Sequence, residues 1–148
     1  MSVIEAGRPA PAISGIDLSG PRALWFYKVT CPVCQMAAPV ANGLGELFPG
    51  RIVGVGQDPP GRLEEFSARY GLDAPSVSDG PPYAVSDAYG IETVPTLVLV
   101  NGETVVDVVQ SWDRDGYNRA SERLADLTRS EPGVVSEAGD GLPPFRPG

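Results

Sequence analysis

The sequence predicts an α/β domain built on a central mixed sheet, and three observations support this fold class. A continuous apolar run at Ala23–Tyr27 is typical of a strand buried on both faces. Strand-like and helix-like segments then alternate up to about residue 90, which favours a sheet with helices on both faces. An Asn101-Gly102 pair between two β-rich runs predicts a late antiparallel hairpin. We therefore expect a mixed sheet of four to five strands.

Each element follows from a local pattern. Strands are expected at Ala23–Tyr27, Arg51–Gly56, Pro75–Asp79, Thr96–Val100 and Glu103–Val109. Helices are expected at Pro32–Phe48, Gly61–Tyr70, Tyr83–Gly90 and Asp113–Arg129. Pro32 suits a first helical position, where its missing N–H costs nothing, and Asp113 is the expected N-cap of the last helix.

The length and composition of the chain indicate its domain organisation and exclude some classes of partner. The 148 residues suit one domain over residues 1–129, followed by a Gly- and Pro-rich tail over 130–148 that has little to pack and should be mobile. A net charge of −8 argues against nucleic acid as a partner, because phosphate binding needs a basic face. No apolar stretch reaches the length of a membrane span. The start lacks a signal-peptide pattern, so a cytoplasmic site is expected unless an export signal has been removed.

The cysteine and histidine content restricts the chemistry. Both cysteines lie in "TCPVC", Thr30–Cys34, and the chain has no histidine. Two cysteines three positions apart form neither a structural disulfide framework nor a closed zinc site. Without histidine there is no Cys–His nucleophile and no Ser–His–Asp triad. No resident metal and no cofactor are therefore expected, and the dithiol itself is the candidate reactive group.

The position of the dithiol predicts two different roles. If a helix begins near Pro32, Cys31 lies at its N-terminus, where unpaired N–H groups and the helix dipole stabilise a thiolate. The pKa of Cys31 should then fall below its free value. Cys34 lies one turn further along and more buried, so it is placed to attack a mixed disulfide formed at Cys31.

A proline directly before a strand is the second element of the candidate site. "ETVPTLVLV" places Pro95 at the entry of the strand that begins at Thr96. Proline cannot donate to a ladder at such a point and sometimes has a cis peptide bond. This leaves backbone groups of Val94 free to pair with an extended substrate.

These motifs together resemble the thioredoxin superfamily, in particular the redoxin branch of thiol–disulfide oxidoreductases and alkyl hydroperoxide reductase relatives. The resemblance spans roughly residues 6–127 and rests on "GRPAPAISGIDLSG", "ALWFY", "CPVC" opening a helix, "VSDAYGIETVPT" and "VLVNGETV". It implies a thioredoxin-like fold, with Cys31 as nucleophile, Cys34 as resolving thiol and Pro95 as a cis-proline facing them. Around these catalytic positions, substrate contact is assigned to Thr30, Pro32, Val33 and Val94. The implied partners are disulfide-containing or dithiol proteins and an external reductase or thiol donor.

The sequence also departs from the family pattern. Trp25 stands where thioredoxins have a buried Asp that accepts the proton of the resolving thiol, and Asp58 is a weak candidate for a substitute. A solvated turn is the favoured interpretation of Asp58. The peroxiredoxin pattern P-x-x-x-T-x-x-C fails, because Thr30 precedes Cys34 by four positions.

Three functions from different classes remain open at this point. A thiol–disulfide oxidoreductase acting on protein disulfides is the favoured one. A thiol peroxidase would form a sulfenic acid at Cys31. A non-catalytic module, such as a dithiol carrier of copper(I), is the third, since thiolates are soft ligands. The sequence sets neither the redox potential nor the direction of exchange, although a cytosolic site favours reduction.

Overall fold

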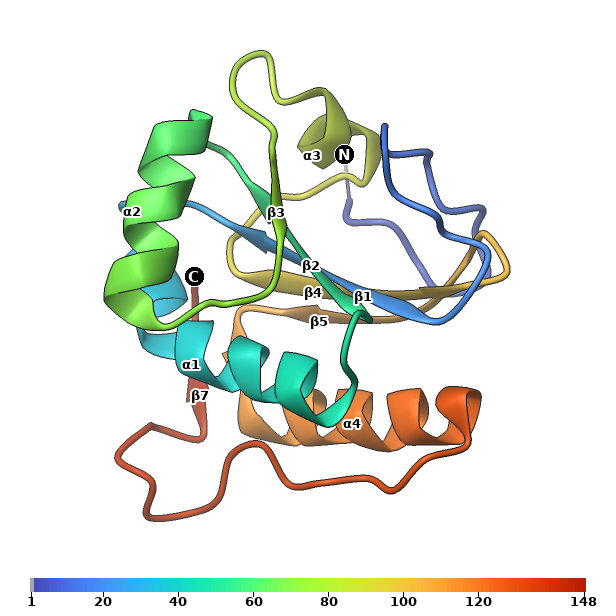
Figure 1. The fold of residues 1–148 in the computed structure, drawn as a ribbon, viewed down its shortest axis with the longest axis vertical. Helices are drawn as coiled ribbons and strands as arrows, with labels where there is room; N and C mark the ends of the chain where they lie inside the picture. The colour runs from blue at the N-terminus through green and yellow to red at the C-terminus, as the bar shows by residue number, and fades with distance from the viewer. Residues whose placement is uncertain (1) are drawn as a thin grey trace.

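A five-stranded mixed sheet forms the centre of the computed structural model, which describes residues 2–148 (Figure 1). The strand order is β3-β2-β1-β4-β5, with β1, β2 and β3 parallel and β4 antiparallel to both β1 and β5. The strands are β1 Arg22–Tyr27, β2 Ile52–Gly56, β3 Ser76–Ser78, β4 Thr96–Asn101 and β5 Thr104–Gln110. The expected mixed sheet is confirmed.

Helices and a second, smaller sheet complete residues 2–148. The helices are α1 Pro32–Leu47, α2 Pro60–Tyr70, α3 Ala84–Ala88 and α4 Arg114–Thr128. The smaller sheet pairs β6 Trp112–Asp113 with β7 Phe145–Arg146. Boundaries of the expected helices and of the first five strands agree with the structure to within two residues. No helix in the described part of the chain combines the length and the apolar character that a membrane span requires.

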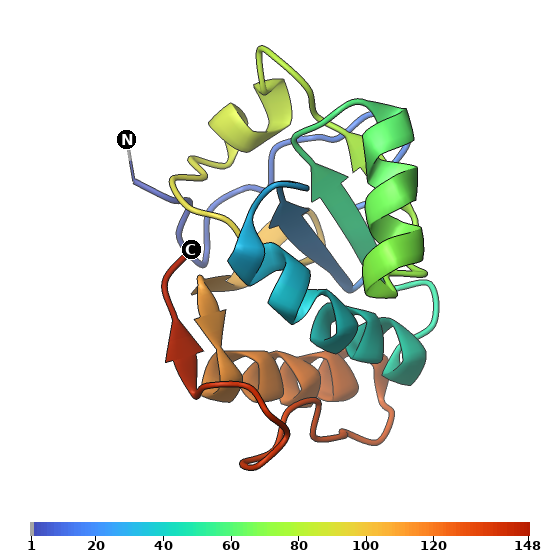
Figure 2. The same ribbon diagram turned by 90° about the vertical axis from the view of Figure 1, so that its left-hand side faces the viewer.

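Alternate residues of β1 face two separate cores. Trp25 and Tyr27 point to the face covered by α1, α2 and α4, whereas Leu24 and Phe26 point to the opposite face. That opposite face is covered by the N-terminal segment and by residues in and next to α3 (Figure 2). These four β1 side chains have no exposed surface. This explains why β1 has no polar side: a strand with helices or loops packed on both faces must be apolar throughout.

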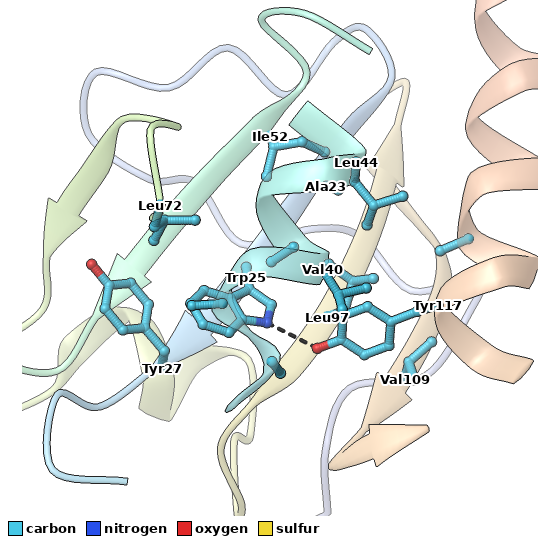
Figure 3. Packing of buried hydrophobic residues seen from close by; sticks show 14 of the residues in the cluster. Ala23, Trp25, Tyr27, Val40, Leu44, Ile52, Leu72, Leu97, Val109 and Tyr117 are labelled. Atoms are coloured by element: carbon cyan, nitrogen blue, oxygen red, sulfur yellow. Dashed lines mark hydrogen bonds between the residues drawn. The ribbon is translucent and has the colours of Figure 1, made fainter. Parts of the chain in front are cut away.

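A buried pair of aromatic side chains joins β1 to α4. The Nε1–H of Trp25 donates a hydrogen bond of 2.9 Å to the hydroxyl oxygen of Tyr117, and both side chains are fully buried (Figure 3). Trp25 also stacks on Tyr27, with ring centroids 4.8 Å apart. The indole N–H therefore has a partner in a place where an unpaired donor would be costly. Trp25, at the position where thioredoxins have a buried Asp, is uncharged, and its N–H is hydrogen-bonded to Tyr117.

The hairpin between β4 and β5 differs by one residue from the expected turn. Asn101 is still paired, opposite Thr104, and the two loop residues are Gly102 and Glu103. Both have positive φ, 58° and 60°, as a type I′ turn requires. The expected Asn-Gly turn is therefore corrected to Gly102–Glu103, because Asn101 supplies the last rung of the ladder.

The segment from residue 130 to 148 packs along α4, contrary to the expectation that it has little to pack. Polar side chains spaced along one face of α4 bind its backbone. Ser121 Oγ donates to Gly133 O at 2.6 Å, Asn118 Nδ2 to Ser136 O at 2.8 Å, and Arg114 Nη2 to Leu142 O at 2.8 Å. The segment was expected to make few contacts because its composition is short of apolar side chains. That expectation is wrong, since the segment is held mainly by hydrogen bonds to its backbone, which composition does not reveal. The division at residue 129 and the mobility of the tail stay predictions.

Candidate active site

Cys31 occupies the N-cap position of α1. Its backbone is extended, with φ −83° and ψ 114°, and Pro32 provides the first helical residue. The sulfur accepts a hydrogen bond from the backbone N–H of Cys34, with a distance of 3.3 Å. A sulfur at an N-cap replaces the usual hydroxyl or carboxylate oxygen and faces the free N–H groups of the first turn. The local sequence thus places one half-buried sulfur where negative charge is stabilised.

Several groups stabilise the thiolate form of Cys31. A hydrogen bond from the thiol of Cys34 is the largest, and together with the N–H groups of Cys34 and Val33 it lowers the pKa of Cys31 to about 6. Partial burial acts in the opposite direction, and the guanidinium of Arg146 adds a small favourable effect. The sequence predicted an acidic Cys31 from the helix N-terminus. The structure adds the second sulfur as the strongest donor.

Cys34 lies in the opposite environment. Its side chain has no exposed surface and belongs to the core that contains Trp25 and Tyr117. Burial, followed by its hydrogen bond to Cys31, raises the pKa of Cys34 well above the ordinary range of a thiol. Both cysteines are free thiols in this structure. Cys34 therefore holds its proton until that proton is removed by another group.

Val94 and Pro95 lie next to the Cys31 sulfur. The Val94–Pro95 peptide bond is cis, and the Cys31 thiol donates a 3.5 Å hydrogen bond to the carbonyl oxygen of Val94. Val94 is partly exposed, whereas Pro95 is buried. The carbonyl oxygen of Pro95 accepts a 2.8 Å hydrogen bond from the N–H of Ser111, just after β5. Two segments 63 residues apart in sequence thus meet at one sulfur.

The three residues assigned to substrate contact around the dithiol differ in exposure. Thr30 and Pro32 are exposed beside the half-buried Cys31. The side chain of Val33 is 6% exposed and packs in the core, so its N–H rather than its side chain faces the Cys31 sulfur. Thr30 also borders a hollow of about 240 Å³, which is lined further by Val29, Gln35, Arg62, Glu65, Phe66, Arg69 and Tyr70.

Asp58 lies in the bend after β2, half-buried, and two hydrogen bonds fix its position. Its Oδ2 accepts a 2.9 Å hydrogen bond from the N–H of Val29, and Ser78 Oγ donates to its backbone oxygen at 2.6 Å. Its negative charge contributes to the raised pKa of Cys34. Asp58 stays half-exposed in this bend, so a proton-accepting role for it remains a prediction. A carboxylate is present near Cys34, although it comes from the loop after β2 and not from β1.

Sequence reasoning missed three residues near the site. Tyr117 is the partner of Trp25 in the core that contains Cys34, and Ser111 is hydrogen-bonded to Pro95. Arg146 contributes a positive charge that acts on Cys31. All three come from segments at least 75 residues after the dithiol in sequence. One signal was available, because the buried Trp25 needed a hydrogen-bond acceptor and Tyr117 lies on the apolar face of α4.

The fold and the dithiol arrangement define a thioredoxin-like protein. The chain matches the model of the AhpC/TSA family over residues 12–109, well over half of its length, and it belongs to that family. The resemblance to the redoxin branch is confirmed. A search of curated proteins finds no significant match.

Solved structures similar to this chain are thiol–disulfide oxidoreductases. Mycobacterium tuberculosis dsbF is 27% identical, with a TM-score of 0.63, over 74% of this chain and 82% of its own. A secreted M. tuberculosis disulfide oxidoreductase homologous to E. coli DsbE is 21% identical, with a TM-score of 0.64, over 83% and 96%. The thioredoxin domain of a Bacteroides vulgatus thiol-disulfide oxidoreductase is 20% identical, with a TM-score of 0.70, over 82% and 99%. The last two likenesses bear on the fold alone.

Proposed function

We propose that this protein exchanges thiols and disulfides with partner proteins, using Cys31 as nucleophile and Cys34 as resolving thiol. The observation behind the proposal is the environment of the Cys31 sulfur. It is half-buried, receives N–H groups at the start of α1, and lies 3.5 Å from the Val94 carbonyl oxygen beside cis-Pro95. Membership of the AhpC/TSA family supports redox activity in general.

The first step is attack on the substrate disulfide. The Cys31 thiolate forms a bond to one substrate sulfur, the substrate S–S bond breaks, and the departing sulfur leaves as a thiolate that takes a proton from water. A pKa of about 6 keeps most of Cys31 ionised near neutral pH. The product of this step is a mixed disulfide between Cys31 and the substrate.

The second step is release of the substrate. The Cys34 thiol gives up its proton, and its thiolate attacks the Cys31 sulfur. The mixed disulfide breaks, a Cys31–Cys34 disulfide forms, and the second substrate sulfur leaves as a thiolate that is protonated. Two electrons pass from the dithiol to the substrate. An external dithiol donor must then reduce the Cys31–Cys34 disulfide before another cycle.

Asp58 supports this second step as the proton acceptor. Cys34 is fully buried with a raised pKa, so its proton does not leave unaided near neutral pH. The Asp58 carboxylate is held by the Val29 N–H and is near enough for its charge to act on Cys34. We propose that Asp58 takes the proton, directly or through one water, as the second bond forms.

The exposed residues around Cys31 and the Val94 backbone would hold the substrate. Val94 is partly exposed, and it precedes a residue without an N–H, so its backbone is available to an extended peptide. Thr30 and Pro32 are exposed and directly precede and follow Cys31 in sequence. Disulfide-containing or dithiol proteins remain the proposed partners, reduction the proposed direction, and the cytoplasm the proposed site.

The test is turnover of a protein disulfide, such as that of insulin, with dithiothreitol as electron donor. We expect the Cys31→Ser variant to fall to the rate of dithiothreitol alone, because the attacking thiolate is missing. Cys34→Ser should instead accumulate a mixed disulfide that survives gel electrophoresis without reductant. A Thr128→Ser variant on α4, far along the chain from the dithiol, is the matched hydroxyl control. Wild-type activity no higher than that of Cys31→Ser would refute the proposal.

Peroxide reduction is a second candidate, favoured by membership of the AhpC/TSA family. The Cys31 thiolate would take one oxygen from the peroxide to give a sulfenic acid and an alcohol or water, and Cys34 would then form the disulfide and release water. Against it stands the position of Thr30, which does not fit the peroxidase pattern. Trapping of a sulfenic acid at Cys31 in the Cys34→Ser variant tests it. Native mass spectrometry of the wild-type protein, which keeps both thiols, tests the copper(I) alternative.

A further inference from the structure

Residues 145–148 run beside the end of β5 and toward the dithiol. Strand β7 pairs antiparallel with β6, with Arg146 opposite Trp112 and Phe145 opposite Asp113. The N–H of Gly148 then donates a 3.1 Å hydrogen bond to Ser111 Oγ. Figures 1 and 2 show this end of the chain near the start of α1. The segment therefore follows the edge that leads from β6 to the candidate active site.

Gly148 lies directly against the Val94–Pro95 loop. A Cβ atom built on Gly148 would collide with the carbonyl oxygen of Val94 and would lie 2.7 Å from Thr93 Oγ1. The same Val94 oxygen is 3.5 Å from the Cys31 sulfur. One carbonyl group is thus in contact with both the reactive thiol and the end of the segment.

The C-terminal segment is held more firmly before residue 145 than after it. Before residue 145 the contacts are buried or strong: Trp112 Nε1 donates to Pro143 O at 2.7 Å, and the N–H of Arg114 donates to Pro144 O at 3.0 Å. From residue 145 onward the side chains are exposed, with Phe145 at 55%. The hydrogen bonds that hold residues 145–148 are a short ladder with β6 and one bond to the Ser111 side chain, and Gly148 also lies against Val94. The last four residues can therefore separate while the preceding residues stay in place.

We propose that residues 145–148 occupy the peptide-docking edge formed by Val94 and Ser111, and that an extended disulfide substrate must displace them to reach Cys31. The inference rests on the proposed function. The geometry supports it because Gly148 lies against the Val94 carbonyl, which belongs to the backbone that an extended substrate is proposed to bind. A segment held by so few bonds lowers the affinity for a substrate without abolishing it.

The test is a variant that ends at Pro144, which keeps both backbone acceptors of Trp112 and Arg114. Removal of residues 145–148 should raise the second-order rate of reduction of an extended peptide disulfide by roughly three- to tenfold. The rate with the small disulfide 5,5′-dithiobis(2-nitrobenzoic acid) should change less than twofold. Arg146 leaves with the segment, so both rates are measured at pH 8, where Cys31 is ionised with or without it. Equal or lower peptide rates in the shortened variant would overturn the proposal.

A single substitution tests the same contact without shortening the chain. Gly148→Ala places a methyl group against the Val94 carbonyl, so it should raise the peptide rate in the same direction as the deletion. Gly61→Ala is the matched control, because a Cβ there meets nothing within 4 Å. Gly148→Ala behaving like Gly61→Ala would contradict the docked geometry.

Hydrogen exchange separates this proposal from the proposed function. In the Cys34→Ser variant, formation of a mixed disulfide with the peptide should remove the protection of the amides of Arg146 and Gly148. Protection that persists in the mixed disulfide would show that the substrate binds elsewhere. Failure to form any mixed disulfide would instead remove the proposed function, so the two failures are distinct.

Discussion

Cys31 and Cys34 lie one turn apart in α1, yet the two sides of that turn differ in every property that governs sulfur chemistry. On the outer side, Cys31 is half-buried and surrounded by hydrogen-bond donors, which lower its pKa to about 6. On the inner side, Cys34 has no exposed surface and burial raises its pKa. The comparison shows that one helix start can hold a half-buried thiol of lowered pKa and a fully buried thiol of raised pKa, only three residues apart.

The largest difference expected between the two sulfurs is in alkylation. At pH 7 iodoacetamide should modify Cys31 at least about a hundredfold faster than Cys34, since the first is mostly thiolate and the second is a buried thiol. Mass spectrometry of peptides from the reduced protein gives both rates. Unfolding in guanidinium chloride is the control, and it should make the rates similar. Comparable alkylation rates of Cys31 and Cys34 in the folded protein would show that the two thiols do not differ in acidity and exposure.

The same contrast predicts a pH dependence of stability. The pKa of Cys31 falls from an ordinary 9.0 to about 6 on folding, so the unfolded chain binds more protons between these values. The free energy of unfolding of the reduced protein should therefore rise with pH from about 6 to 9, and this gain is lost as the pH falls through 6. Cys34 has a raised pKa and acts oppositely, above pH 9.

We would measure the guanidinium chloride midpoints of the wild type and of Cys31→Ala at each pH. The difference between the two proteins gives the contribution of the Cys31 thiol to the free energy of unfolding. The difference between the two proteins should grow with pH across the window. A difference that stays constant from pH 5 to 9 would show that the Cys31 thiolate gains nothing from the folded environment.

Asp58→Asn should affect the reaction of Cys34 and leave that of Cys31 unchanged. Asn keeps an oxygen that can accept from the Val29 N–H, but it cannot accept the proton of Cys34. Release of substrate from the mixed disulfide should slow by about tenfold, with the first attack unchanged. Stopped-flow rates of the two steps are the measurement, and Asp87→Asn on the exposed side of α3 is the control. Equal slowing of both steps would point to a structural role.

Tyr117→Phe gives the smallest expected effect on the site. The substitution removes the acceptor of the buried Trp25 N–H, so the free energy of unfolding should fall by about 1–3 kcal/mol. The pKa of Cys31 should not change, because its stabilising groups lie at the start of α1. Chemical denaturation and a pH titration of alkylation measure the two quantities. A marked shift in the Cys31 titration would show that the inner side also controls the outer one.

Local sequence patterns predicted most of the fold and the position of Cys31 at the start of α1. The run Ala23–Tyr27 is apolar at every position because both faces of β1 are covered, and a five-residue pattern suffices to show it. Pro32 after Cys31 marks the helix start in the same way. The hairpin shifted by one residue because positive φ at Gly102 and Glu103, not the Asn-Gly pair, defines the turn.

Contacts between distant segments were the part that sequence could not supply. The bond from Trp25 to Tyr117 joins residues 92 apart, and the Asp58 contact with Val29 joins residues 29 apart. The C-terminal segment packs through backbone acceptors, which every residue has and no composition reveals. The polar stripe Arg114, Asn118 and Ser121 on α4 was the readable signal, because polar side chains at helical spacing on a partly buried face need partners.

The two tryptophans lie at the two places where this molecule is proposed to change. Trp25 belongs to the same core as Cys34, and Trp112 contacts Pro143 at the base of the C-terminal segment. Replacing either indole by phenylalanine leaves one tryptophan, which can be excited selectively over the five tyrosines. Emission from the protein itself can then follow sulfur oxidation in one variant and segment displacement in the other, with no dye attached.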